Sequence, residues 1–217
     1  MKNKVEALNW PILIALEKSA GLVPDTLRLI AKQVDAKTGT TLFRAGDRVR
    51  NVYLVIQGEA RLIRVGHDGD VVILQRSRGG FIAEASLDSR IYHCDAVTTE
   101  ATTLVVFPAV AFRAAFEEDQ SFRRTWQSLL AQEVRKLRAQ CERLSLNSAV
   151  DRVKHYIESE GTSGVVILSQ TKKALAAELG LSHEALYRTL RQMENDGLLS
   201  VQGNRLSSVA SSRSQSD

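Results

Sequence analysis

Four side chains that can bind a metal or carry protons stand side by side near the middle of the chain, at Tyr92, His93, Cys94 and Asp95. Imidazole and thiolate groups are ligands of transition metals and haem, and an activated thiolate can act as a redox centre. If this segment is a strand, neighbouring side chains point to opposite faces, so His93 and Cys94 cannot easily share one metal, although either can supply one ligand. The segment is compatible with a metal, haem or redox site, but such residues on a half-buried strand are more often structural.

A second group of side chains, further along the chain, suits double-stranded DNA. Arginine can bond bidentately to guanine O6 and N7, and glutamate can accept from cytosine N4, so Glu184 and Arg188 on the outer face of a helix could read a base pair. Lysine side chains and the amides at a helix N-terminus can meet phosphates. The predicted DNA contacts are Thr171, Lys172, Lys173, Ser182, His183, Glu184, Tyr187 and Arg188.

A helix-turn-helix is the element expected to hold these residues. Thr171 and Ser182 are placed to cap two successive helices, and Gly180 can take the positive φ that ends the first one. The residues expected to face inward are Leu175, Ala176, Leu179, Leu186 and Leu190. A third helix carrying Met193 and a wing of two short strands around residues 203–204 are expected to follow. A small helical bundle with a charged face shares single features with this pattern, but not the whole set of spacings.

A long helix is predicted before this motif, because residues 112–144 contain no glycine or proline. Five residues recur at spacings of 4, 3, 4 and 3, which is the pattern of a coiled-coil seam: Leu130, Val134, Leu137, Cys141 and Leu144. We interpret the seam as the contact of a parallel homodimer. A helix that packs on its own domain is the alternative.

The first half of the chain has the pattern of a β-sandwich or jelly-roll barrel. Residues 38–108 contain short runs of Val, Leu, Ile and Thr, several of them alternating with polar residues, and glycine-containing turns separate these runs. A helical pattern precedes them at about residues 5–33. The fold class is therefore α+β, with a β-rich jelly-roll domain at 1–118, a dimerisation helix at 119–146, a winged helix-turn-helix at 147–209 and a disordered polar tail at 210–217.

Charge, cysteine content and the length of apolar runs narrow the possible functions and locations. The net charge is +4, but residues 146–217 carry eight basic and eight acidic groups, so charge alone does not nominate this part as a DNA binder. The two cysteines form neither a disulfide framework nor a zinc set. No apolar run approaches the ~20 residues of a membrane span, and the first residues resemble an amphipathic helix more than a signal peptide. A cytoplasmic protein with no membrane partner is expected.

On these motifs, the chain resembles the CRP/FNR superfamily of bacterial transcription factors, named after the cyclic-AMP receptor protein and the fumarate-nitrate reduction regulator, over about residues 20–209. The recognition helix of that family reads Ser/Thr-Arg-Glu-Thr-Val-(Gly/Ser)-Arg, and residues 182–188 read SHEALYR. Glu184 and Arg188 match, whereas His183 replaces an arginine and Tyr187 replaces a small residue. The resemblance implies a cyclic-nucleotide-binding-like β-roll, and a homodimer whose Glu184 and Arg188 read a G·C pair in each half of a palindromic promoter site. It also implies RNA polymerase as a partner.

The resemblance also places an effector pocket in the β-roll, at Ala83, Glu84, Ala85, Ser86, Tyr92, His93 and Cys94. In the cyclic-AMP branch, a glycine admits the ligand, a glutamate binds the ribose and an arginine pairs with the phosphate. Here Ala83 stands at the glycine and Tyr92 at the arginine, and Glu84 is retained. Removing one partner of a buried ion pair costs about 3–5 kcal/mol, so cyclic AMP is not expected unless a shift in register brings Arg90 into the pocket.

Other effectors stay open. Oxygen sensors of the family hold an iron–sulfur cluster on cysteines near the N-terminus, and because no cysteine precedes Cys94, that cluster is excluded. A carbon-monoxide-sensing branch binds haem through Cys and His in this region, which leaves haem, a redox-active Cys94, an unidentified ligand or no ligand. The other class of protein that a jelly roll allows is a metal-dependent cupin enzyme. The histidines at 67, 93, 155 and 183 are scattered and form no His-x-His pair, so an enzyme is not expected.

Overall fold

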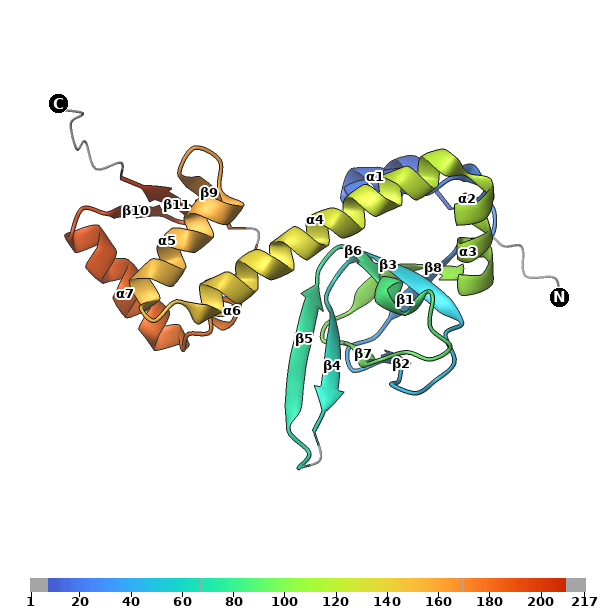
Figure 1. The fold of residues 1–217 in the computed structure, drawn as a ribbon, viewed down its shortest axis with the longest axis horizontal. Helices are drawn as coiled ribbons and strands as arrows, with labels where there is room; N and C mark the ends of the chain where they lie inside the picture. Colours follow the sequence, from blue (N-terminus) through green and yellow to red (C-terminus); the bar gives the residue numbers. More distant parts are fainter. Residues whose placement is uncertain (1–7, 67, 169, 210–217) are drawn as a thin grey trace. The chain divides into compact units, whose positions relative to one another are not determined.

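Short strands make up most of the first half of the chain, as the pattern of residues 38–108 predicts (Figure 1). The structure is a computed structural model that describes residues 8–66, 68–168 and 170–209, and the chain divides into two compact units, residues 1–128 and 129–217. The predicted disordered tail at 210–217 lies outside the described residues. The strands of the first unit are β1 (Lys32–Ala36), β2 (Thr41–Phe43), β3 (Asn51–Gln57), β4 (Ala60–Val65), β5 (Val71–Ser77), β6 (Gly80–Ile82), β7 (Asp95–Thr98) and β8 (Thr102–Pro108).

These strands form two four-stranded antiparallel sheets, with the orders β1-β8-β3-β6 and β2-β7-β4-β5. In the first sheet, β3 lies between β8 and β6, and Leu54 pairs with Val105 in a register where both side chains are fully buried. Five successive residues of β3 are buried, which explains why this strand reads as an apolar run and not as an alternation. The predicted β-sandwich is confirmed.

Three short helical segments precede the sheets: α1 (Trp10–Leu16), the 3-10 helix η1 (Lys18–Leu22) and α2 (Asp25–Arg28). Asn9 caps α1 by accepting a hydrogen bond from the Ile12 amide at 3.3 Å. The helical pattern predicted to residue 33 extends too far, because β1 already begins at Lys32. Pairing of Lys32 with Val106 of β8 outweighs the local helical preference at that point.

The two helices that follow β8 are α3 (Ala109–Glu118) and α4 (Gln120–Ser145). Asp119 separates them: its side chain accepts a hydrogen bond from the Phe122 amide at 2.9 Å, as an N-cap does. The first turns of α4 pack within the first unit through a cluster of aromatic rings from β6, β8, α3 and α4, namely Phe81, Phe107, Phe112, Phe116, Phe122 and Trp126.

The second unit contains the predicted winged helix-turn-helix. Its elements after α4 are α5 (Ala149–Glu160), β9 (Val165–Ile167), α6 (Lys172–Glu178), α7 (His183–Asn195), β10 (Leu199–Gln202) and β11 (Arg205–Ser208). The three strands form an antiparallel sheet in the order β10-β11-β9, and β10 and β11 make the wing predicted around residues 203–204.

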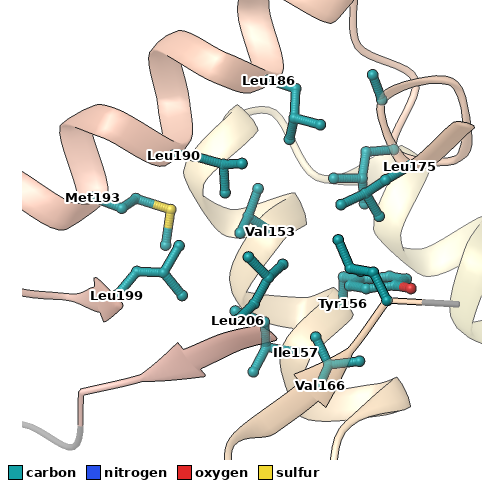
Figure 2. Close-up of a cluster of buried hydrophobic side chains, with 13 residues drawn as sticks. Val153, Tyr156, Ile157, Val166, Leu175, Leu186, Leu190, Met193, Leu199 and Leu206 are labelled. Atoms are coloured by element: carbon teal, nitrogen blue, oxygen red, sulfur yellow. The ribbon is translucent and has the colours of Figure 1, made fainter. Parts of the chain in front are cut away.

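Figure 2 shows the core of this unit, where side chains from α5, α6, α7 and the sheet converge. The predicted inward residues Leu175, Leu186 and Leu190 are buried in it. The prediction of a separate helix carrying Met193 was wrong: Met193 lies on α7, because this helix continues without a break from His183 to Asn195. Its burial three residues beyond Leu190 extends the same apolar face.

Candidate nucleic-acid interface and sensor region

The turn between α6 and α7 forms as its residues predict. The Thr171 hydroxyl accepts from the Ala174 amide at 3.2 Å, and the Ser182 hydroxyl accepts from the Ala185 amide at 3.1 Å, so both helices have a side-chain N-cap. Gly180 has a φ of +63°, and a Cβ on it would lie 2.9 Å from Cδ2 of Leu144. The left-handed backbone angle favours glycine at this turn, because a residue with a Cβ is strained there.

The outer face of α7 carries the side chains predicted to read bases. His183, Glu184, Tyr187 and Arg188 are all exposed, while Leu186 and Leu190 on the opposite face are buried. Hydrogen bonds from its own backbone amide and from the Ser182 hydroxyl lower the pKa of Glu184, which keeps this carboxylate ionised and able to accept from an exocyclic amine. Thr171 and Lys173 at the start of α6 are exposed as well.

Tyr187 is held between the two helices of the motif. The ring centroids of His183 and Tyr187 lie 4.6 Å apart, which follows from their i, i+4 spacing on α7. From α6, the Lys172 ammonium lies 5.6 Å from the centroid of the Tyr187 ring, within the range of a cation–π contact. Lys172, predicted as a phosphate contact, is thus half-buried and engaged with a ring of its own chain.

Arg191 belongs to the same face, although the sequence reasoning missed it. It lines a hollow on the surface of α7 together with Glu184, Tyr187 and Arg188. The signal was present in the sequence, because Arg191 follows Arg188 by three residues and therefore shares its helix face. It adds a second guanidinium to the part of α7 that carries the predicted base contacts.

A fully buried arginine fastens the last turns of α4 to the helix-turn-helix. The Arg143 guanidinium bonds Glu178 of α6 and Glu160 of α5, each at 3.3 Å, and the Ser159 hydroxyl at 2.9 Å. It also lies 4.9 Å from the centroid of the Tyr156 ring. One side chain therefore joins three helices of the second unit.

A second arginine caps two chain segments at once. The Arg152 guanidinium donates to the carbonyl oxygens of Leu144 (3.4 Å) and Leu146 (2.9 Å), where α4 ends. It also donates to the carbonyl oxygens of Leu179 (3.1 Å) and Gly180 (3.2 Å) in the turn before α7. Carbonyls at helix ends lack partners within the helix, and here one side chain satisfies them in two places.

In the sensor region, Tyr92 is part of the core. Its hydroxyl donates to the Asn51 carbonyl oxygen at 2.9 Å and accepts from the amides of Arg50 and Asn51 at 3.2 and 3.0 Å. Its ring stacks on Phe43 with centroids 4.0 Å apart. The side chain at the position of the family's arginine is thus fixed by backbone groups of the β-roll. The prediction that Tyr92 faces an effector is not supported by these contacts.

The rest of the predicted effector pocket surrounds the 3-10 helix η2 (Glu84–Ser86). Ala83 has a left-handed φ of +71°, an angle that glycine adopts without strain and that matches the family's glycine at this position. The Ser86 hydroxyl and Nδ1 of His93 are 2.8 Å apart. Ser86 is buried, Ala85 is exposed and Glu84 is half-buried.

His93 and Cys94 do not face the same surroundings. His93 is exposed and Cys94 is 1% exposed, which agrees with the expectation that neighbours here point in opposite directions. Burial raises the pKa of the Cys94 thiol, which disfavours the reactive thiolate. Among the described residues, no group of three or more His, Cys, Asp or Glu side chains is placed to hold a metal ion. His93 and Cys94 can therefore supply at most one ligand to the same metal centre.

The predicted seam of α4 is exposed along its whole length. Leu130, Val134, Leu137 and Leu144 are 36%, 45%, 56% and 43% exposed, and Cys141 is an exposed free cysteine. Apolar side chains at heptad spacing on the surface of a helix mark a face that can pack against another helix.

Comparison with known families assigns both units. Residues 33–119 match the cyclic nucleotide-binding domain, and residues 144–209 match the Crp-like helix-turn-helix domain. The chain belongs to the CRP/FNR superfamily. It is a DNA-binding transcription regulator and not an enzyme, so the cupin alternative is discarded.

Relatives agree with this assignment. The nitrogen fixation regulation protein FixK of Bradyrhizobium diazoefficiens is 24% identical over 180 residues, which cover 79% of this regulator and 76% of FixK. The structure of FixK2 from Bradyrhizobium japonicum has a TM-score of 0.61 at 19% identity and covers 82% of this chain and 92% of its own. A putative cyclic nucleotide binding protein from Ruegeria pomeroyi has a TM-score of 0.58 at 19% identity, with 92% and 93% covered. Among the described helices of the regulator, none has the length and hydropathy to cross a membrane.

Proposed function

We propose that this regulator binds a palindromic double-stranded DNA site as a homodimer, with α7 of each protomer in the major groove, and that a signal other than cyclic AMP controls it. The observation that carries the proposal is the outer face of α7, where Glu184, Arg188 and Arg191 are presented on a capped and well-packed helix. A carboxylate and a guanidinium four residues apart suit the two edges of a G·C pair. Such a target places the protein in the cytoplasm, with RNA polymerase as a further partner.

The homodimer is supported by the exposed apolar stripe on α4. When two copies pack along this stripe, four exposed aliphatic side chains are removed from water, which favours association: Leu130, Val134, Leu137 and Leu144. A two-fold dimer presents two recognition helices, and these fit half-sites one helical turn, ~34 Å, apart. The palindrome follows from the symmetry of the dimer.

Control by something other than cyclic AMP is supported by Tyr92. Its hydroxyl is bonded to backbone groups of residues 50 and 51, so it is not free to pair with a phosphate, and it carries no positive charge. Ala83 also places a methyl group where the family's glycine lets the ligand approach.

The central experiment is selection of a binding site from random DNA, followed by titration of the selected and scrambled duplexes with the wild type and with Arg188→Ala. We expect Arg188→Ala to lose about 1–3 kcal/mol of discrimination at one base pair of each half-site while non-specific binding persists. Arg135→Ala, an exposed position on the outer side of α4, is the matched control and should retain full discrimination. Equal discrimination by Arg188→Ala and the wild type contradicts the assigned role.

The effector is tested separately. Cyclic AMP titrated into the purified protein should change neither the affinity for the selected site nor the stability of the first unit. An absorbance spectrum and mass spectrometry of molecules released from the purified protein will then separate haem, a small organic ligand and no ligand. A micromolar response of DNA binding to cyclic AMP contradicts the proposal.

A further inference from the structure

We infer that Tyr187 is a specificity-determining residue that contacts the 5-methyl group of a thymine in the major groove, next to the base pair bound by Glu184 and Arg188. This inference rests on the proposed binding of α7 to DNA and goes beyond it, because it assigns a base to a residue that departs from the family's recognition sequence. It also gives Lys172 and His183 a role as positioning residues for the ring.

The Tyr187 ring is contacted by neighbouring side chains without being part of the core. Tyr187 is 46% exposed, and the buried side chains of α7 lie on the opposite face. Lys172 approaches the ring from α6, and His183 approaches it from the preceding turn of α7. A ring held from two helices loses little further freedom when it binds, which favours its use as a contact surface.

Tyr187 lies among the residues of α7 that are predicted to contact bases. Tyr187 lies one residue before Arg188 and three after Glu184, and all three side chains line the same surface hollow on α7. A helix that places Glu184 and Arg188 against base edges therefore brings the Tyr187 ring to a base edge in the same groove.

The chemistry of the Tyr187 ring matches that of a thymine methyl group. The ring is apolar over most of its surface, and the apolar group that base pairs present in the major groove is the thymine methyl. Adenine, guanine and cytosine present polar atoms there, which an aromatic ring would desolvate without replacing their hydrogen bonds. The alternative for this side chain is a hydrogen bond from its hydroxyl to a phosphate, which carries no sequence information.

The test removes one methyl group at a time. In the selected duplex, each thymine of one half-site is replaced by deoxyuridine, which lacks the methyl and keeps every hydrogen-bonding atom. At one thymine, we expect the wild type to lose about fourfold in affinity, the equivalent of one buried methyl or methylene group. Tyr187→Ala should bind the thymine and deoxyuridine duplexes equally, and Tyr187→Phe should retain the wild-type difference.

A matched pair of lysines tests the positioning role. Lys172→Gln releases the ring from α6 and should reduce the discrimination between thymine and deoxyuridine. Lys173→Gln alters the neighbouring exposed lysine and should lower affinity for both duplexes by the same factor. Equal discrimination in Lys172→Gln and Lys173→Gln overturns the positioning role of Lys172.

The outcomes separate the inference from the function on which it rests. If no sequence is selected, DNA binding itself fails, and the inference fails with it. If a site is selected but Tyr187→Ala leaves every thymine-to-deoxyuridine difference unchanged, or if the half-site contains no thymine, DNA binding stands and the inference is overturned. If Tyr187→Phe behaves as Tyr187→Ala does, the hydroxyl makes the contact and the methyl contact is wrong.

Discussion

At the scale of single residues, buried charges in this protein are held by several partners each. Glu59 is 2% exposed and accepts from Arg61 at 2.6 Å, from Arg78 at 2.9 Å and from the Thr99 hydroxyl at 2.8 Å. Burial by itself raises the pKa of a carboxyl, but the hydrogen bonds from Thr99 and Arg61 and the charges of Arg61 and Arg78 outweigh it and hold the pKa of Glu59 below its ordinary value. The ionised form is thus favoured in the folded state.

This shift gives a pH dependence with a definite sign. Because the folded pKa lies below the unfolded value of about 4.3, the stabilisation is complete above that value and disappears as pH falls through the folded pKa. We expect Glu59→Gln to be less stable than the wild type at pH 7, and the difference to shrink as pH falls below about 4. Urea unfolding followed by tryptophan fluorescence measures this, because Trp10 and Trp126 both lie in the first unit. Glu117→Gln, at an exposed position, should follow the wild type; an undiminished difference at low pH contradicts the prediction.

In the second unit, Arg143 is a buried charge that is likewise held by several partners. Arg143→Ala leaves the carboxylates of Glu160 and Glu178 close together without their cation, and breaking such a pair costs about 3–5 kcal/mol. Both glutamates are about 30% exposed, so water will screen them and we expect the lower end of this range. Far-UV circular dichroism during urea unfolding measures the loss in this helical unit. Arg135→Ala on the same helix should change the free energy of unfolding by less than about 0.5 kcal/mol. A similar small change in Arg143→Ala means that the buried guanidinium contributes little.

At the scale of elements, the exposed Cys141 in the seam of α4 can report whether two α4 helices pair. In a parallel pair of helices, equivalent residues of the seam face each other, which brings two Cys141 side chains within reach of a disulfide. We expect mild oxidation to give a covalent dimer of the wild type and of Cys94→Ser, whose buried cysteine is replaced, but not of Cys141→Ser. Non-reducing electrophoresis distinguishes them. Leu137→Glu should weaken the proposed dimer in sedimentation experiments, and an unaltered dimer in this variant places the contact elsewhere.

Local patterns predicted the elements better than the contacts between them. The caps at Thr171 and Ser182 and the turn at Gly180 depend on residues within a few positions, so the sequence indicates them directly. The boundary of β1 was missed because it depends on pairing with β8, about 70 residues away. The hydrogen bonds of Tyr92 could not be predicted for the same reason: they reach back to residues 50 and 51, which no local pattern reveals.

At the scale of the whole molecule, the balance of charge sets how salt affects binding. Residues 146–217 carry equal numbers of acidic and basic groups, so a few lysines and arginines supply most of the attraction to phosphates. Lys173→Gln removes one predicted phosphate contact per protomer. The slope of log affinity against log salt should become shallower by about 1.8 for a dimer and by about 0.9 for a monomer. Lys37→Gln, an exposed lysine of the first unit, should leave the slope unchanged. An unchanged slope in Lys173→Gln removes that residue from the interface.

The position of Arg152 has a mechanical consequence. Its guanidinium is bonded both to the end of α4 and to the turn that precedes α7. We expect this link to couple a rotation of the last turn of α4 to the position of the recognition helix. In a dimer paired along α4, the distance and the relative orientation of the two recognition helices would then be set together. The operator would have to match them in helical phase, and sequences with the right half-sites at the wrong spacing would be rejected.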